Sequence, residues 1–229
     1  MITAIFATKD VEWGLAHALH ALVPGATEGI LRDVIVIDGG SRDGTAIVAD
    51  AAGCEIIEGS GVAEDDLRLA AERARSDWLL FLSPECVLDQ GWQTEVLEFV
   101  GAAAESGKAR SCAAVFRLGR AEYSSRARLA EWLATFRTKV LTAPYEEQGL
   151  LISRALYRSL GGHRRLAAMA DVDLARRIGR RRLTLLRKRA TVRMPRKESV
   201  GLFRAVRNGA CLALFVLRFP PGIIGRLAA

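Results

Sequence analysis

The run VIVIDGGSRDGT, from Val34 to Thr45, restricts the fold more than any other stretch of the chain. Four β-favouring residues lead into Asp38, the pair Gly39-Gly40 predicts a tight turn, and Asp43 stands at the expected start of a helix. This pattern places a carboxylate at the carboxyl end of a buried strand, beside backbone that a ligand can approach. Open α/β sheets bind small molecules at that edge. A plain strand-to-helix turn fits the run equally well.

Apolar runs and helical spacing alternate along the rest of the chain. Strands are expected at 2–8, 34–37, 55–57, 78–82 and 112–116, with a further apolar piece at 149–153. Helices are expected at 13–23, 43–52, 64–75, 92–104, 126–141 and 171–178, and a brief one before Gly161-Gly162. Pro24-Gly25 is expected to end the first helix. The alternation predicts an α/β fold with a mostly parallel, Rossmann-like sheet flanked by helices.

The positive charge is concentrated at the carboxyl end. Residues 181–229 hold 12 Lys or Arg and one acid, a formal charge of +11, while residues 1–180 hold 21 basic and 25 acidic residues, or −4. We therefore expect a main domain at 1–195 and a basic, helical, amphipathic arm at 196–229. The arm suggests an anionic partner such as a membrane surface or a phosphate-bearing substrate. Nucleic acid is not expected, because no aromatic interleaving or binding motif accompanies the arginines.

Composition and spacing also indicate the compartment. The four cysteines are far apart and form no CxxC pair, which argues against zinc or a disulfide framework and for a reducing cytosol. No signal peptide is expected at 1–8. The uncharged run 208–217 is about half of what a bilayer span requires. A cytoplasmic protein is expected, with the arm either lying on the inner face of the membrane or docking onto the protein's own core.

Four segments in order make the chain resemble a known family. They are VIVIDGGSRDGT at 34–45, ARSDWLLFLSPECVLDQGW at 74–92, PYEEQGLLISRALYRSLGG at 144–162 and MADVDLARRI at 169–178. Together they resemble the family 2 glycosyltransferases of the GT-A fold, over nearly the whole chain. Within that family the chain looks like the small bacterial enzymes with a DGGS motif.

The resemblance implies a nucleoside-diphosphate (NDP) sugar as donor, a hydroxyl acceptor and inverting transfer of a hexose-type sugar. It implies that Asp38 contacts the base or ribose of the nucleotide, with Thr8 and Gly40 close to it. Arginines near the loops are candidates to hold the pyrophosphate, at 176–177 and 180–182.

The resemblance also implies metal and acid–base roles. Glu85 matches the last acid of a D-x-D-like motif that binds Mg²⁺ or Mn²⁺, which neutralises the leaving diphosphate. Asp171 matches a general base, which a weakly nucleophilic sugar hydroxyl needs. Glu147 and Gln148 are expected to line the site, where relatives carry polar residues.

Two alternatives to an active glycosyltransferase are considered, and the first follows from departures from the family pattern. The segment Ser83-Pro84-Glu85 holds one carboxylate where many relatives have two, and Ala170 replaces the first acid of the late motif. A catalytically degenerate sugar-nucleotide-binding or scaffold protein therefore remains a second hypothesis. A nucleotidyltransferase ranks third, because residues 1–27 contain no phosphate loop rich in glycine and lysine.

Five further residues are given structural interpretations. Asp43 is expected to cap a helix, His163 to face solvent in a loop and Asp173 to lie at the surface. Trp78 and Trp92 are expected to pack in the core or at the edge of the sheet.

Overall fold

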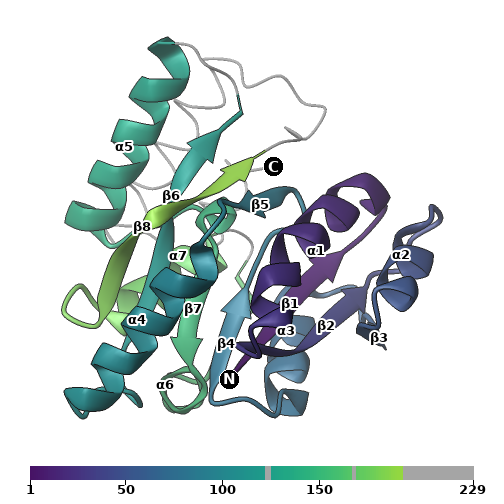
Figure 1. The fold of residues 1–229 in the computed structure, drawn as a ribbon, viewed down its shortest axis with the longest axis horizontal. Coiled ribbons are helices and arrows are strands. Elements are labelled where there is room, and N and C mark those ends of the chain that lie inside the picture. Colours follow the sequence, from purple (N-terminus) through teal and green to yellow (C-terminus); the bar gives the residue numbers. More distant parts are fainter. Residues whose placement is uncertain (122–124, 167–168, 193–229) are drawn as a thin grey trace.

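The computed structural model describes residues 1–121, 125–166 and 169–192 (Figure 1). The basic arm predicted for 196–229 lies outside the described residues, so its helical character stays a prediction. Within these described residues the sheet has eight strands, in the order β3-β2-β1-β4-β7-β6-β8-β5. The strands are β1 (Ile2–Thr8), β2 (Leu31–Asp38), β3 (Glu55–Glu58), β4 (Trp78–Phe81), β5 (Cys86–Leu88), β6 (Ala113–Arg120), β7 (Leu150–Ser153) and β8 (Leu183–Val192).

Seven α-helices and one 3₁₀ helix surround the sheet in the described part of the chain. They are α1 (Glu12–Thr27), α2 (Thr45–Ala51), α3 (Ala63–Arg73), α4 (Trp92–Glu105), α5 (Ser125–Leu141), η1 (Glu146–Gln148), α6 (Arg154–Ser159) and α7 (Ala170–Ile178). Apolar residues of α1, α2 and α4 cover one face of the sheet, and those of α3, α6 and α7 cover the other. The sheet alternates accordingly: in β4, Trp78 and Leu80 face the first core while Leu79 and Phe81 face the second.

The direction of the strands decides where a ligand site can form. β1 pairs in parallel with β2 and β4, β2 with β3, and β6 with β8. β7 runs antiparallel to β4 and β6, and β5 antiparallel to β8. The predicted mostly parallel sheet is confirmed. β3, β2, β1, β4, β6 and β8 all run in one direction, so their carboxyl ends lie along one edge of the sheet.

The first helix does not end at Pro24-Gly25 as predicted, because α1 continues to Thr27. A proline within a helix removes one backbone N–H donor, which here leaves only the bond to the carbonyl of residue 20 unmade. Gly25 lets Trp92 of α4 approach the helix, since a Cβ at Gly25 would lie 2.6 Å from the Trp92 ring. Trp92 also donates its indole N–H to the carbonyl of Ala21 (2.8 Å). This tertiary packing holds the last turn of α1 in place.

Two strands of the sheet, β5 and β8, were not predicted from the sequence. The middle of β8 carries the run Arg187-Lys188-Arg189, whose charges hide the alternation typical of a strand. The two carboxylate oxygens of Glu95 in α4 accept the backbone N–H groups of Arg187 (2.6 Å) and Lys188 (2.7 Å). This contact lies where the pairing of β6 with β8 changes register, after Val115. Long-range pairing therefore makes this strand.

The predicted basic helix is present as α5, at the end of the molecule farthest from α2 (Figure 1). Its exposed side is partly apolar, with Trp132 61 % and Phe136 49 % exposed and their rings stacked at 5.8 Å. No helix in the described residues is both long enough and apolar enough to cross a bilayer.

Candidate functional site

Three predicted site residues lie together where β1 and β2 end. Thr8 is paired with Asp38 in the sheet register, and the N–H of Gly39 donates to the carbonyl of Thr8 (2.8 Å). The Thr8 side chain is buried and donates to the carbonyl of Ile37 (3.0 Å). Gly40 has φ +81°, in the left-handed region that favours glycine. The predicted strand, turn and carboxylate are therefore present, with Asp38 half-buried at the edge of the sheet.

The loop that follows Asp38 is held in one conformation. Both carboxylate oxygens of Asp38 accept the backbone N–H of Ser41, at 3.1 and 3.2 Å, and Oδ1 also accepts the Ser41 hydroxyl. Asp10, in the loop after β1, donates its N–H to Ser41 Oγ (3.0 Å) and accepts the N–H of Arg42 (2.7 Å). The loops after β1 and β2 are thus joined to each other, so this part of the edge is preorganised for a ligand.

Asp43 has a structural role, as expected. Its carboxylate accepts the N–H of Glu12 (3.1 Å), the first residue of α1, and the N–H of Thr45 (3.0 Å), the first residue of α2. The Thr45 hydroxyl and the Glu12 N–H, in that order, lower the pKa of Asp43 below its usual value. The N-cap position of α2 is held by Gly44, one residue after the predicted Asp43, yet the Asp43 carboxylate bonds the first N–H groups of two helices at once.

The Glu85 turn lies against the first turn of α1. A Cβ at Gly14 would lie 2.8 Å from the carbonyl oxygen of Pro84, so helix and turn touch backbone to backbone. The same helix starts at Glu12, whose carboxylate accepts the N–H of Gly44 (3.1 Å) in the loop after β2. The first turn of α1 therefore lies between the Asp38 loop and the turn that carries half-buried Glu85.

The charges of three acids act on Cys86, which follows Glu85. The Cys86 side chain is buried, and burial raises the pKa of its thiol, followed by the charges of Glu147, Glu85 and Glu146. Glu85 and Glu147, which are far apart in the sequence, thus both act electrostatically on the same thiol. Within the described residues, no group of three or more His, Cys, Asp or Glu side chains could hold a metal ion.

Gln148 shapes this region from inside. Its side chain does not line the site as predicted, because the residue is 0 % exposed. Its amide donates to the carbonyl of Phe116 (2.8 Å) and accepts from the Thr138 hydroxyl (3.0 Å) and the Tyr145 N–H (2.9 Å). The Gln148 amide thus finds its hydrogen-bond partners within the protein. These bonds fix the loop that carries half-buried Glu147.

Asp171, the second residue of α7, has a side chain that is 39 % exposed. One carboxylate oxygen, Oδ1, lies 3.3 Å from Nε2 of His163. The prediction that His163 faces solvent is wrong, because its side chain is only 1 % exposed. Gly161 and Gly162, at φ +75° and +67°, turn the chain inward, and the His163 ring packs edge-on against Phe81 (5.1 Å). Asp171 is thereby brought to the carboxyl end of β4.

The arginines proposed for the pyrophosphate are placed differently from one another. Arg177 is held inside the protein, where it donates to Asp173 and to the carbonyls of Leu160 (2.6 Å) and Gly162 (2.8 Å). Asp173 is correspondingly not a surface residue, since its side chain is 17 % exposed. Arg180 to Arg182 lie at the amino edge of the sheet, because the carbonyl of Arg182 accepts the N–H of Ala113, the first residue of β6. The strand direction therefore excludes these three from the carboxyl edge.

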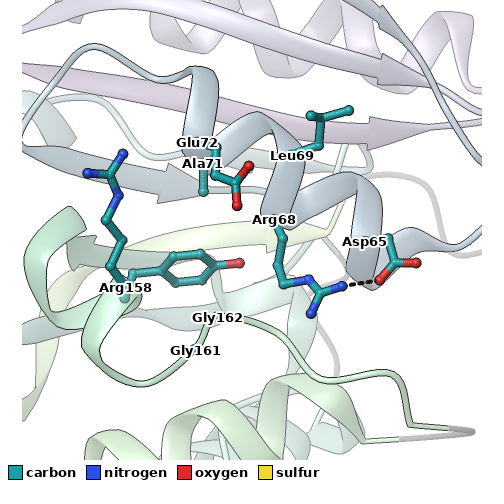
Figure 2. A pocket seen from close by; sticks show the side chains of 9 residues that line it. Asp65, Arg68, Leu69, Ala71, Glu72, Arg158, Gly161 and Gly162 are labelled. Carbon is teal, nitrogen blue, oxygen red and sulfur yellow. Dashed lines mark hydrogen bonds and ion pairs between the residues drawn. The ribbon is translucent and has the colours of Figure 1, made fainter.

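A cavity of about 380 Å³ opens beside the site, between α3 and α6. Figure 2 shows Asp65, Arg68 and Glu72 of α3 opposite the turn at Gly161 and Gly162. The cavity carries both signs of charge, and Tyr157 forms part of its wall. None of the predicted site residues lines it.

Comparison with known proteins places the fold. No protein-family model and no curated protein sequence matches the chain. Glucosyl-3-phosphoglycerate synthase from Mycobacterium tuberculosis, in complex with Mn²⁺, UDP and glucosyl-3-phosphoglycerate, superposes with a TM-score of 0.62 at 18 % identity, covering 96 % of this chain and 81 % of that chain. Its complex with Mn²⁺, UDP-glucose and phosphoglyceric acid gives 0.61 at 19 %, covering 96 % and 80 %. Its complex with Mg²⁺ and UDP gives 0.62 at 19 %, with the same coverage.

This likeness confirms the predicted fold class: the chain has a GT-A-type glycosyltransferase fold. Membership of family 2 and the roles of individual residues stay predictions.

Proposed function

We propose that the chain is a glycosyltransferase that moves a sugar from an NDP-sugar to a hydroxyl acceptor. The observation that carries the proposal is the placement of Asp171. An exposed carboxylate, backed by a buried histidine, stands at the carboxyl edge of a GT-A-type sheet, as does the preorganised Asp38 loop. The solved structures of this fold named above hold UDP or UDP-glucose, which supports a nucleotide-sugar donor here.

In the proposed reaction, Asp171 is the catalytic base. As the acceptor oxygen forms its bond to the anomeric carbon, the bond from that carbon to the diphosphate breaks, and the hydroxyl proton passes to the Asp171 carboxylate. A single displacement of this kind inverts the configuration of the anomeric carbon. A positioned base contributes about 10²–10⁴-fold to such a step. Asp38, half-buried after β2, would hold the base or ribose of the nucleotide.

The residues present fit a divalent cation. Mg²⁺ at a substrate diphosphate takes one or two protein carboxylates, and phosphate oxygens and water complete its coordination. A single carboxylate at Glu85, half-buried in the turn beside α1, meets that need. When bound, Mg²⁺ or Mn²⁺ supplies positive charge that stabilises the departing diphosphate. Glu85 would hold it, with the substrate's own oxygens.

Turnover of a donor panel tests the proposal. Purified protein is incubated with Mn²⁺, sugar acceptors and each of the common UDP-, GDP- and dTDP-sugars, and release of the nucleoside diphosphate is measured. We expect release with at least one donor, and it should increase when an acceptor is added. If no donor binds or turns over, the proposal fails.

Replacing Glu85 by Gln should uncouple nucleotide binding from the metal. In the unchanged protein, we expect Mn²⁺ to tighten binding of the matching nucleoside diphosphate in calorimetry, and EDTA to reverse this. Glu85→Gln should lose roughly tenfold or more of that enhancement. Glu105→Gln, an exposed acid at the end of α4, is the matched control and should behave as the unchanged protein does. Equal Mn²⁺ enhancement in both variants would remove Glu85 from the metal site.

A sugar-nucleotide-binding protein without catalysis is the second candidate. The single carboxylate in Ser83-Pro84-Glu85 and the alanine at Ala170 favour it. Calorimetry distinguishes the two functions: tight nucleotide binding that needs no metal, together with no turnover of any donor, would support the binding protein.

A further inference from the structure

A line of polar contacts leads from the interior to the Asp171 carboxylate. The Tyr157 hydroxyl oxygen lies 2.8 Å from Nδ1 of His163, and Nε2 of the same ring lies 3.3 Å from Oδ1 of Asp171. Tyr157 is 3 % exposed, and the rings of His163, Tyr157 and Phe81 contact one another. A buried tyrosine thus contacts a buried histidine, which contacts a partly exposed carboxylate.

The count of protons decides the direction of these bonds. Burial raises the pKa of Tyr157, which keeps its single hydroxyl proton. The Tyr157 oxygen also accepts the backbone N–H of His163 (3.3 Å). Its proton can therefore be donated to Nδ1, which makes Nδ1 an acceptor and leaves the ring proton on Nε2. The opposite tautomer would set two acceptors, Nε2 and a carboxylate oxygen, against each other.

We propose that Tyr157 and His163 are positioning residues that hold Asp171 through an Nε2–H to Oδ1 hydrogen bond. This inference rests on the proposed function, in which Asp171 is the base. With Oδ1 engaged, Oδ2 remains for the acceptor hydroxyl, because no described residue bonds to it. The arrangement gives an exposed side chain the fixed orientation that proton transfer requires.

Nuclear magnetic resonance tests the bond without any need for turnover. The protein is labelled with ¹⁵N-histidine, and the His163 signals are identified, among those of three histidines, as the ones absent from His163→Gln. We expect the His163 ring proton on Nε2, with Nδ1 accepting the Tyr157 hydroxyl. Tyr157→Phe removes the donor to Nδ1 and should shift the Nδ1 signal, while the Asp171 contact keeps the proton on Nε2. A ring protonated on Nδ1, or spectra unchanged in both Tyr157→Phe and Asp171→Asn, would overturn the proposal.

Steady-state kinetics on a donor found by the panel tests the consequence. His163→Leu should lower kcat by roughly 10–100-fold with little change in KM for the donor. His163→Gln, whose amide can still donate to Asp171, should recover much of that loss. If His163 had only a structural role, kcat would fall in both variants in proportion to the loss of thermal stability. KM for the donor would then change as well.

A double mutant isolates the path through Asp171. In the Asp171→Asn background, His163→Leu should cause almost no further loss of kcat, because the group that it positions is already inactive. An additive loss would show that His163 acts elsewhere. If the unchanged protein turns over no donor, the proposed function fails, while the tautomer measurement still decides whether this contact exists.

Discussion

Asp171→Asn should lower kcat by about 10²–10⁴-fold, because an amide cannot accept the acceptor's proton. Asn has nearly the same shape, and its Oδ1 can still accept the His163 Nε2–H, so binding of the donor should change little. The side chain is 39 % exposed, and thermal stability should therefore stay close to that of the unchanged protein. Single-turnover kinetics at saturating donor measures the chemical step directly.

The matched control is Asp173→Asn, two residues along the same helix. Asp173 pairs with Arg177 at 2.7 Å and does not reach the substrate in the proposed reaction. Its replacement should lower stability and leave kcat within a few-fold. An Asp171→Asn variant as active as the unchanged protein would exclude Asp171 as the base, whatever the effect at Asp173.

Trp92→Ala should reduce the free energy of unfolding by about 3–5 kcal/mol, as large-to-small changes of buried aromatic residues do. Trp92 is 1 % exposed, fills the space left by Gly25 and donates to the carbonyl of Ala21. The alanine variant leaves a cavity between α1 and α4 and loses the indole hydrogen bond to the Ala21 carbonyl. Urea unfolding followed by circular dichroism gives the loss as a shift of the midpoint at constant slope.

Trp132→Ala serves as the comparison, because the same residue type is 61 % exposed on α5. Its replacement should change the free energy of unfolding by no more than about 0.5 kcal/mol. Similar losses at both tryptophans would contradict the assignment of Trp92 to the core between α1 and α4.

The site was predictable wherever its signal was local in the sequence. The turn after Asp38 is marked by Gly39-Gly40, and the structure has the left-handed glycine there that the motif predicts. The structural role of Asp43 at the start of a helix was predictable for the same reason, since its bond to the Thr45 N–H spans only two residues. Asp43 also accepts the N–H of Glu12 and so joins the loop after β2 to the start of α1. The sequence around Asp43 and the sequence around Glu12 give no sign of this contact.

His163 and Gln148 show where local reasoning failed. A histidine after two glycines has the pattern of a surface loop, yet the glycines turn it into the core against Phe81. Gln148 follows two acids in a polar loop, and its three hydrogen bonds to Phe116, Thr138 and Tyr145 bury it. In both cases a decisive partner, Phe81 for His163 and Phe116 for Gln148, comes from a distant segment, which local sequence patterns cannot identify.

The sequence by itself determined the alternation of strands and helices, the α/β class and the carboxylate at the end of β2, because periodicity and glycine turns act over a few residues. Only the tertiary structure decided that Arg187 to Arg189 form a strand, that Arg180 to Arg182 lie at the amino edge, and that Tyr157 and His163 stand behind Asp171. These features depend on pairing and burial between segments far apart in the chain. The hydrogen bonds and packing that stabilise these features form only when the sheet has assembled.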